Sequence, residues 1–560
     1  MTTSAIEVES TPAKPSPTYD GGPTRKRRQD SGELESTTSH VEELPIGALP
    51  LPPVDSKHGG LHRGLSARQV SMIAIAGTIG TGLFLGTGRS LAQGGPASML
   101  ICYAIVGAIV YVTLLLLGEM ATQYPVAGSF NAYATRFFSP AYGFALSWNY
   151  WFNDAVSVAS DLTAAQLVLQ YWTDRDTWVI SLMFWVFLVS VNSINVRAYG
   201  ELEYWLASLK VITVIIFIIL GILVNVGVNR EHEYIGAKNW HIPGAPFVGG
   251  FGGFAKVFVT ASFAYGGTES LGITAGETKN PSRNMPRVVK FVFWRILLFY
   301  ILSIFLMGLN VPWNYPNLSN KTTTTSPFTI VFQEVGSKAA ASFMNTVILT
   351  SVLSAGNHAL FAGTRVLYGL AVTTPPQAPH FFSYTTPGGN IVGVSNQIAW
   401  LSIGMASWRF RQAWIRQGRP IYEMKFRAGW TWPWGPPFVI ITVIALILIQ
   451  GWSSLAPFSA VDFVSFYIEI PVMIVMYFGW MLIRPSNTHP PLPATTTPVS
   501  LAHRIKERFW KFHDLVDVEV VDLIRDEHEE DDADVADDEE RTARLKGTYR
   551  WLWRVYYLVV

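Results

Sequence analysis

Four ionisable side chains lie inside long apolar stretches of the sequence, where charge is costly and marks a functional group by default. They are Asp154, Asp161, Lys210 and Glu269. Asp154 and Asp161 are seven residues apart, so on a helix they share one face. A lysine buried in an apolar span can give up its proton, which would let Lys210 carry one. A structural ion pair between Lys210 and Asp161 or Glu269 is the alternative, and the residues alone leave both open.

Backbone groups could do further chemistry at residues 77–88 (GTIGTGLFLGTG), which hold five Gly and three Thr inside an apolar segment. Each Gly weakens a helix by about 1 kcal/mol relative to Ala, so this density predicts a break. Irregular backbone at membrane depth is tolerated only where it is buried in protein or lines a cavity. The half-helix after a break offers N–H groups and a dipole that favour an anion such as a carboxylate. On this interpretation Gly82→Val abolishes binding and leaves the fold intact. A small-residue face for helix packing is the other interpretation.

A second stretch of the same kind, residues 263–276, favours the first interpretation. It contains Tyr265, Gly266 and Gly267 near the middle of an apolar span, and Glu269 follows. Two Gly-interrupted spans in corresponding places indicate a transporter site built from discontinuous helices. Counted along the chain, these are spans one and six, which fits two halves of five spans each.

The elements that position these groups are membrane helices. The chain has 560 residues, of which 49% are hydrophobic and 14% are charged, whereas soluble domains carry about 25% charged residues. Several apolar runs reach the roughly 20 residues that cross a lipid bilayer, so we expect an all-α polytopic membrane protein. The net charge of +1 gives no indication of nucleic-acid binding. The sequence contains no metal-ligand spacing, phosphate loop or nucleophile motif, so we expect no enzyme, catalytic residue, cofactor or metal site.

Composition divides the chain into three regions. Residues 1–63 and 486–560 are predicted cytosolic tails, the first of them disordered, and residues 64–485 are the predicted membrane domain. The loop at residues 277–290 has four basic residues and one acidic residue, which favours a cytosolic position. An amphipathic helix is predicted around residues 500–525. The tails could serve trafficking or ubiquitylation machinery, or they could be solvated without a partner.

Several motifs resemble those of the fungal amino-acid permeases of the amino acid–polyamine–organocation superfamily. They lie at residues 77–88, 118–130 (GEMATQYPVAGSF), 200–210 (GELEYWLASLK), 265–269 (YGGTE), 275–281 (AGETKNP) and 363–371 (GTRVLYGLA). The resemblance covers most of residues 65–485. It implies a LeuT-type fold of twelve spans, with two inverted five-helix repeats and broken helices one and six. It also implies secondary active uptake of amino acids with protons across the plasma membrane.

The resemblance further implies roles for individual residues. The substrate carboxylate would bind N–H groups near Gly80, Thr81 and Gly82, and the amino group would lie near carbonyls of that break and of residues 263–265. The residues expected at this site are Ile79, Gly80, Thr81, Gly82, Asp154, Phe263, Ala264, Tyr265 and Gly266. Lys210 matches a lysine that replaces a sodium ion in proton-coupled relatives. Asp161 and Glu269 are the further candidates for proton coupling. Span three would set side-chain selectivity, and the choice between neutral and basic amino acids is left open.

One departure from the family pattern lies near Gly389 and Ile391. The sequence passes there directly into a stretch that resembles the later part of span ten. Span nine and part of span ten are therefore predicted to be missing. The missing material amounts to roughly one helix of about 20 residues, plus loops and part of another helix. The second repeat is therefore expected to be incomplete, through natural variation, splicing or a gene-model error. A non-transporting amino-acid sensor or an inactive variant is the alternative function. We predict that residues 391–406 form a helix that enters partway or lies against the bundle without crossing, because a basic stretch follows.

Overall fold

The computed structural model describes residues 65–172, 178–194, 196–316, 326–373, 376–379, 397–450, 467–483 and 515–524, with isolated positions at 318 and between 452 and 463. The described residues form helices and isolated bridges but no strand. The all-α prediction is therefore confirmed. The predictions for residues 1–63, for the junction at 389–391 and for most of residues 486–560 lie outside the described residues.

The first part of the chain forms a broken helix followed by longer helices. In order they are α1 (Ala67–Thr78), the π-helix η1 (Gly82–Gly86), α2 (Thr87–Gln123), α3 (Phe130–Tyr133), η2 (Ala134–Phe138), α4 (Pro140–Leu169), α5 (Trp178–Ile194) and α6 (Val196–Asn225). Gly95 divides α2, because its φ is +79° and Pro96 follows it. A side chain at Gly95 would also lie 2.6 Å from the carbonyl oxygen of Pro246. The part of α2 before Gly95 thus completes the first apolar segment, and the part after it forms a separate apolar helix.

The second part of the chain repeats the pattern of a broken helix followed by longer ones. Helix α7 (Gly250–Tyr265) ends at a break, and the chain continues as α8 (Ser270–Ile273) and η4 (Thr274–Glu277). The other elements are η3 (Lys238–Trp240), α9 (Pro281–Asn310), α10 (Pro327–Glu334), α11 (Lys338–Val372), α12 (Gln397–Arg416), η6 (Ile421–Glu423), η7 (Gly429–Thr431), α13 (Gly435–Gln450) and α15 (Glu469–Ile483). Spans one and six are therefore both interrupted, as the glycine clusters predict.

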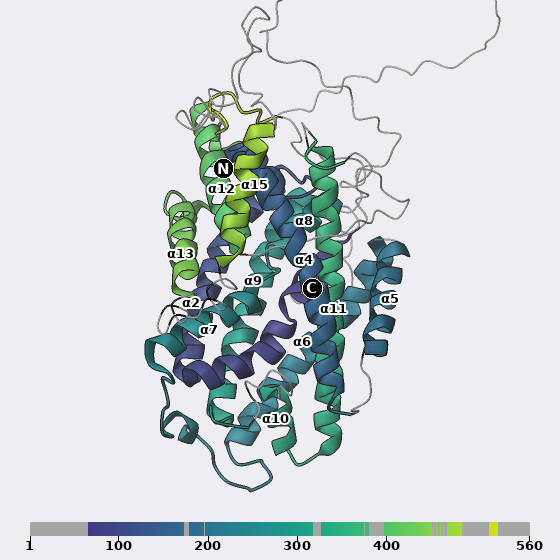
Figure 1. Cartoon of the computed structure of the whole chain (residues 1–560), viewed down its shortest axis with the longest axis vertical. Coiled ribbons are helices and arrows are strands. Elements are labelled where there is room, and N and C mark those ends of the chain that lie inside the picture. Colours follow the sequence, from purple (N-terminus) through teal and green to yellow (C-terminus); the bar gives the residue numbers. More distant parts are fainter. Residues whose placement is uncertain are drawn as a thin grey trace, which may run out of the picture. The chain divides into compact units, whose positions relative to one another are not determined.

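The broken helix α1 is packed among three others. It contacts α6, α9 and α11, while α4 packs along α11 and α2 contacts both α7 and α9; Figure 1 shows α4 and α11 side by side. A Cβ atom built on Gly77 would lie 2.5 Å from the His358 ring, and one on Gly82 would lie 2.4 Å from Cα of Ala264. Glycine at these two positions therefore lets the broken span approach α11 and α7 closely.

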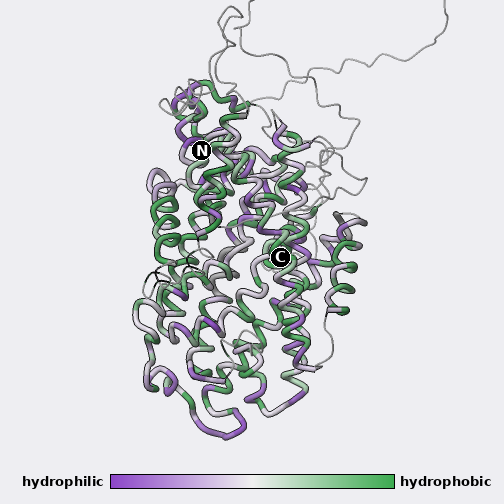
Figure 2. The backbone as a smooth tube through the Cα atoms, in the orientation of Figure 1, coloured by the Kyte–Doolittle hydropathy of each residue, from purple (hydrophilic) through white to green (hydrophobic). Residues whose placement is uncertain are grey.

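The outer helices present apolar side chains to their surroundings. Trp185 on α5, Trp205 on α6 and Val475 on α15 are exposed, and Figure 2 shows α5 and α13 as hydrophobic over much of their length. Among the described residues, the helical stretches that are long and apolar enough to span a bilayer, by length and composition, are Arg68–Gln123, Tyr199–Asn225 and Lys338–Val372. Exposed apolar surface on long helices suits lipid, and the chain is a multi-pass membrane protein.

Helix α12 accompanies only the first part of α4. Near its start, Trp400 donates to the Glu269 carboxylate at the second break (2.8 Å). Further along, Arg409 donates to the carbonyl of Phe137, which precedes α4 (2.7 Å). The helix therefore runs from the level of the α7 break to beyond the beginning of α4. Residues 397–406 are therefore helical and packed against the bundle, and their not crossing the membrane stays a prediction.

A short piece of the C-terminal region, residues 515–524, packs where α12 ends. Tyr124 donates to the carbonyl of Leu523 (2.9 Å), and Arg136 donates to the carbonyl of Asp522 (2.6 Å). Leu523 is 2% exposed. These residues form turns, so the predicted amphipathic helix is wrong for this stretch. Side chains of the bundle bind carbonyls that a helix would pair with its own N–H groups.

Candidate functional site

The first break exposes the ends of two helical segments. Helix α1 stops at Thr78 because Ile79 adopts an extended backbone (φ −81°, ψ 92°), and helical structure resumes at Thr81. The first N–H groups of the resumed helix have no carbonyl partner within it. Ser351 on α11 donates to the carbonyl of Ile79 (3.1 Å) and so satisfies one group of the break. Gly80, Thr81 and Gly82, which follow Ile79, line the adjacent pocket.

The second break lies against the first. Helix α7 ends at Tyr265, and Gly267 has a φ of +87°. A Cβ atom at Gly267 would lie 3.0 Å from the carbonyl oxygen of Gly77 on α1, so glycine permits both the conformation and the contact. The carboxylate of Glu269 accepts a hydrogen bond from the N–H of Gly267 (3.3 Å). This bond holds the turn that separates α7 from α8.

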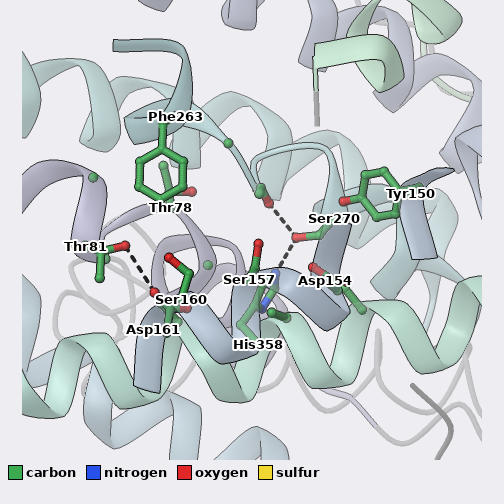
Figure 3. A pocket seen from close by; sticks show the side chains of 18 residues that line it. Thr78, Thr81, Tyr150, Asp154, Ser157, Ser160, Asp161, Phe263, Ser270 and His358 are labelled. Atoms are coloured by element: carbon green, nitrogen blue, oxygen red, sulfur yellow. Dashed lines mark hydrogen bonds between the residues drawn. The ribbon is translucent and has the colours of Figure 1, made fainter. Parts of the chain in front are cut away.

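A pocket lies between the two breaks and is closed on its other sides by α4 and α11, as Figure 3 shows. It contains about 600 Å³ of empty space, and this volume includes space that is open to solvent. The predicted site residues that line it are Gly80, Thr81, Gly82, Asp154, Asp161, Phe263 and Gly266. Five other predicted residues are buried but do not line the pocket: Ile79, Ala264, Tyr265, Lys210 and Glu269.

A tyrosine on α9 joins the two breaks. The hydroxyl oxygen of Tyr300 lies 2.8 Å from the carbonyl oxygen of Thr78 and 2.7 Å from that of Ala264. Because the hydroxyl has one hydrogen, it donates to one of these carbonyls at a time. The Tyr300 ring also stacks on Tyr265, with 4.7 Å between the ring centroids. Sequence reasoning missed Tyr300, since nothing in its local sequence indicates which carbonyls α9 will meet.

The two aspartates of α4 are bonded differently. Thr81 donates to Oδ1 of Asp161 (3.2 Å), which ties α4 to the first break. Asp154 is 7% exposed, and its Oδ2 accepts no hydrogen bond from the described residues. Ser157 and Ser160 line the pocket with them. Sequence reasoning missed both serines, although Ser157 stands three and four residues from the aspartates, a spacing that places it on their helix face.

Lys210 forms a hydrogen bond with the last turn of α1. Its Nζ donates to the carbonyl of Ala76 (2.8 Å), and the side chain is 1% exposed. Its charge interacts with those of Glu203 and Asp161, but no ion pair of Lys210 occurs within the described part of the chain. Glu203 accepts a hydrogen bond from Ser354 on α11 (2.6 Å), and sequence reasoning missed this residue. Lys210 therefore bonds backbone at the first break.

Glu269 joins three helices at the second break. Its carboxylate accepts hydrogen bonds from Tyr150 on α4 (3.1 Å) and from Trp400 on α12 (2.8 Å). The side chain is fully buried. Helix α12, which follows the junction at residues 389–391, thus supplies a hydrogen bond to the edge of the site.

A histidine on α11 also reaches the pocket. Nε2 of His358 lies 2.6 Å from the hydroxyl of Ser270, which begins α8, and Nδ1 lies 3.3 Å from the hydroxyl of Tyr199. Sequence reasoning missed this residue even though an ionisable group inside an apolar span was a usable signal. Within the described residues no cluster of His, Cys, Asp and Glu could hold a metal ion.

The pocket combines groups that suit a small zwitterion. N–H groups at a helix start attract a carboxylate, and carboxylates together with backbone carbonyls attract an ammonium group. Hydroxyls of Ser157, Ser160 and Ser270 can donate or accept.

Comparison with known proteins shows which family the chain resembles. The chain matches the amino acid permease family over residues 69–389 and 388–488. A probable amino-acid permease of Schizosaccharomyces pombe is 43% identical over 472 residues, covering 76% of this chain and 92% of the relative. The lysine-specific permease LysP of Escherichia coli is 40% identical over 469 residues, covering 77% and 95%. A general amino-acid permease of Candida albicans is 38% identical over 505 residues, covering 81% and 83%.

The two matched segments meet at residues 388–389, where the sequence predicts that spans are missing. Together they extend over most of the chain, and the relatives are permeases, which transport rather than catalyse. With its two broken spans and the pocket between them, the chain belongs to the amino acid permease family.

Proposed function

We propose that this permease is a secondary active amino-acid transporter that couples uptake to protons across the plasma membrane. The observation that carries the proposal is the pocket between two broken spans, where helix-start N–H groups and carboxylates face one space. The names of the relatives, a lysine-specific permease and a general amino-acid permease, support an amino acid as the substrate.

In this proposal the substrate carboxylate binds the N–H groups at Thr81 and Gly82, where the helix dipole favours an anion. The α-ammonium group lies near Asp161, which Thr81 holds beside the first break. The sequence suggests the carbonyls of residues 263–265 for the ammonium group. Because the Tyr300 hydroxyl can donate to either the Ala264 or the Thr78 carbonyl, we assign the Ala264 carbonyl instead to holding the two breaks together.

Proton coupling is assigned to Lys210, with Asp161 and Glu269 as the further groups. The Lys210 ammonium bonds the Ala76 carbonyl in the last turn of α1, so loss of its proton would weaken a bond that holds this half-helix. The Asp161 carboxylate interacts electrostatically with Lys210 and also accepts a hydrogen bond from Thr81 at the break. A change of protonation would therefore act on the segment that binds the substrate carboxylate.

An amino-acid sensor is the second candidate function, and the division of the family match at residues 388–389 favours it. A permease that lacks one full span could bind its ligand without completing a transport cycle. The hydrogen bond from Trp400 to Glu269 supports the opposite view, because the helix after the junction still reaches the second break.

Counterflow in proteoliposomes distinguishes the two functions. Vesicles that carry the purified full chain are loaded with unlabelled amino acids, diluted, and given trace labelled amino acid outside. A transporter takes up label transiently above the level of protein-free vesicles. Equilibrium binding without counterflow identifies a sensor, and a chain that does neither contradicts both functions.

A further inference from the structure

Asp154 is a buried carboxylate for which the described residues supply no counter-ion. Its side chain lines the pocket and is 7% exposed. A backbone interaction with Gly363 on α11 holds the carboxyl group, while Oδ2 accepts no hydrogen bond from the described residues. Figure 3 shows this carboxyl group on α4, directed toward the part of the pocket near Ser157 and Ser270.

The charges that act on Asp154 are negative. Glu269 and Asp161 are the charged groups whose fields reach it. The cations near the pocket in the described bundle have other partners. Lys210 donates to a backbone carbonyl, and Arg365 forms a buried ion pair with Glu277. A buried carboxylate without a cation is costly. Protonation would remove the charge but would create an O–H donor, which also needs a partner.

The spacing of the two aspartates matches the length of a substrate with two cationic groups. Seven residues of helix separate Asp154 from Asp161, a rise of about 10.5 Å along one face. Six bonds of about 1.5 Å separate the two nitrogens of an extended lysine, which puts them about 7 Å apart. The two lengths are close enough for each nitrogen to reach one carboxylate over a charge-assisted hydrogen bond of about 2.8 Å. Ala355, Ala359 and Ala362 on α11 leave room for the aliphatic stem.

We propose that Asp154 binds the cationic end of the substrate side chain, so that the pocket selects amino acids with a second ammonium group or a guanidinium group. The inference rests on the proposed function, since it requires an amino acid in this pocket. A neutral side chain of equal length would leave Asp154 buried and unpaired. That penalty, rather than extra attraction alone, discriminates against neutral amino acids.

Equilibrium binding to the purified full chain in nanodiscs tests this assignment without requiring transport. Labelled lysine is displaced by unlabelled lysine, arginine, norleucine and Nε-acetyl-lysine. Binding to wild type is compared with binding to Asp154→Asn, which keeps the shape of the side chain and removes its charge. Glu423→Gln makes the same acid-to-amide change on an exposed residue and serves as the control.

We expect wild type and the control to bind lysine at least about 30-fold more tightly than norleucine or acetyl-lysine, in line with the loss of one partner from a buried charge pair. In Asp154→Asn that preference disappears, while norleucine binds as well as before or better. Equal affinity of wild type for lysine and norleucine overturns the inference whether or not the variant folds. Retained lysine preference in Asp154→Asn, or equal loss of every ligand, also overturns it. A wild-type chain that binds no amino acid refutes the proposed function as well.

Discussion

Individual side chains hydrogen-bond to the helix ends at the two breaks and hold them in place. Lys210 and Tyr300 bind carbonyls near the ends of α1 and α7, and Thr81 is tied to Asp161. The Lys210 and Tyr300 bonds are buried, so loss of either donor leaves an unsatisfied carbonyl that costs about 1–3 kcal/mol. The bond from Thr81 is partly buried, and its acceptor is the Asp161 carboxylate. The geometry of the pocket therefore depends on a few donors that do not need to touch the substrate.

Replacing Lys210 tests the coupling assignment at this scale. We expect Lys210→Met to abolish accumulation driven by an acidic exterior, because the group that gains and loses the proton is gone. Exchange of labelled for unlabelled amino acid should persist, since the lysine does not line the pocket. Lys238→Met, an exposed lysine outside the bundle, should leave both activities unchanged. Accumulation by Lys210→Met at wild-type level would contradict the role of Lys210.

The sequence could identify some of these residues and not others for a physical reason. Lys210, Asp154 and Asp161 are recognisable because a charge inside an apolar span is unfavourable without a function. Tyr300 carries no such mark, since tyrosine is common in membrane helices and its partners come from α1 and α7. His358 could have been identified by the same rule as Lys210.

Broken helices are the elements that build the site, and their breaks follow from local sequence. Glycines at 77, 80, 82, 266 and 267 predict both interruptions, and the structure has them at those places. The sequence does not reveal why each glycine is needed, since that depends on what packs opposite. A Cβ atom built on Gly82 lies 2.4 Å from Cα of Ala264, so Gly82→Val would overpack this contact, and we now expect the variant to be destabilised.

A pair of alanine substitutions in η1 tests this contact. Gly82→Ala should destabilise the protein by about 1–3 kcal/mol through overpacking, and it should weaken amino-acid binding. Gly86→Ala serves as the control, because its built Cβ atom lies 3.9 Å from the nearest contact. Thermal unfolding and equilibrium binding are measured for both. Equal stability of the two variants would show that α7 does not pack against Gly82.

Helix α12 is held in the bundle by a buried ion pair. Arg411 donates to Glu119 on α2, and both side chains are 5% exposed or less. We expect Arg411→Ala to destabilise the protein by about 3–5 kcal/mol, since Glu119 would remain buried and unpaired. Arg416→Ala removes an exposed pair with Glu519 and should cost less than about 1 kcal/mol. If denaturation of the two variants is indistinguishable, α12 is not docked on α2 as described.

At the scale of the whole molecule, a second half that the sequence predicts to be shortened must still give a consistent membrane topology. Helix α12 covers only the part of α4 from its beginning to the second break. The loop after α12 therefore lies at the same end of the bundle as the beginning of α4. Six basic residues between 409 and 427 favour the cytosolic side for that end.

Cysteine labelling from outside intact cells tests this topology. In a Cys102→Ser background, Tyr422→Cys on the loop after α12 should remain unlabelled until the cells are permeabilised. Tyr234→Cys, on the loop between α6 and α7, should be labelled at once. Both native side chains are exposed, at 87% and 65%, so access depends on the side of the membrane alone. Labelling of Tyr422→Cys in intact cells would mean that α12 belongs to a complete crossing.

Accumulation of a labelled amino acid in proteoliposomes tests the central claim most directly, because it requires binding, alternating access and proton coupling in the same chain. Purified protein is reconstituted, the exterior is made acidic relative to the lumen, and internal label is followed over time. We predict accumulation above the external concentration, collapse of that gradient on addition of a protonophore, and no accumulation without a pH difference. Uptake that stops at the external concentration under every pH difference would contradict proton-coupled transport. Binding with no uptake would leave an amino-acid sensor as the function of the chain.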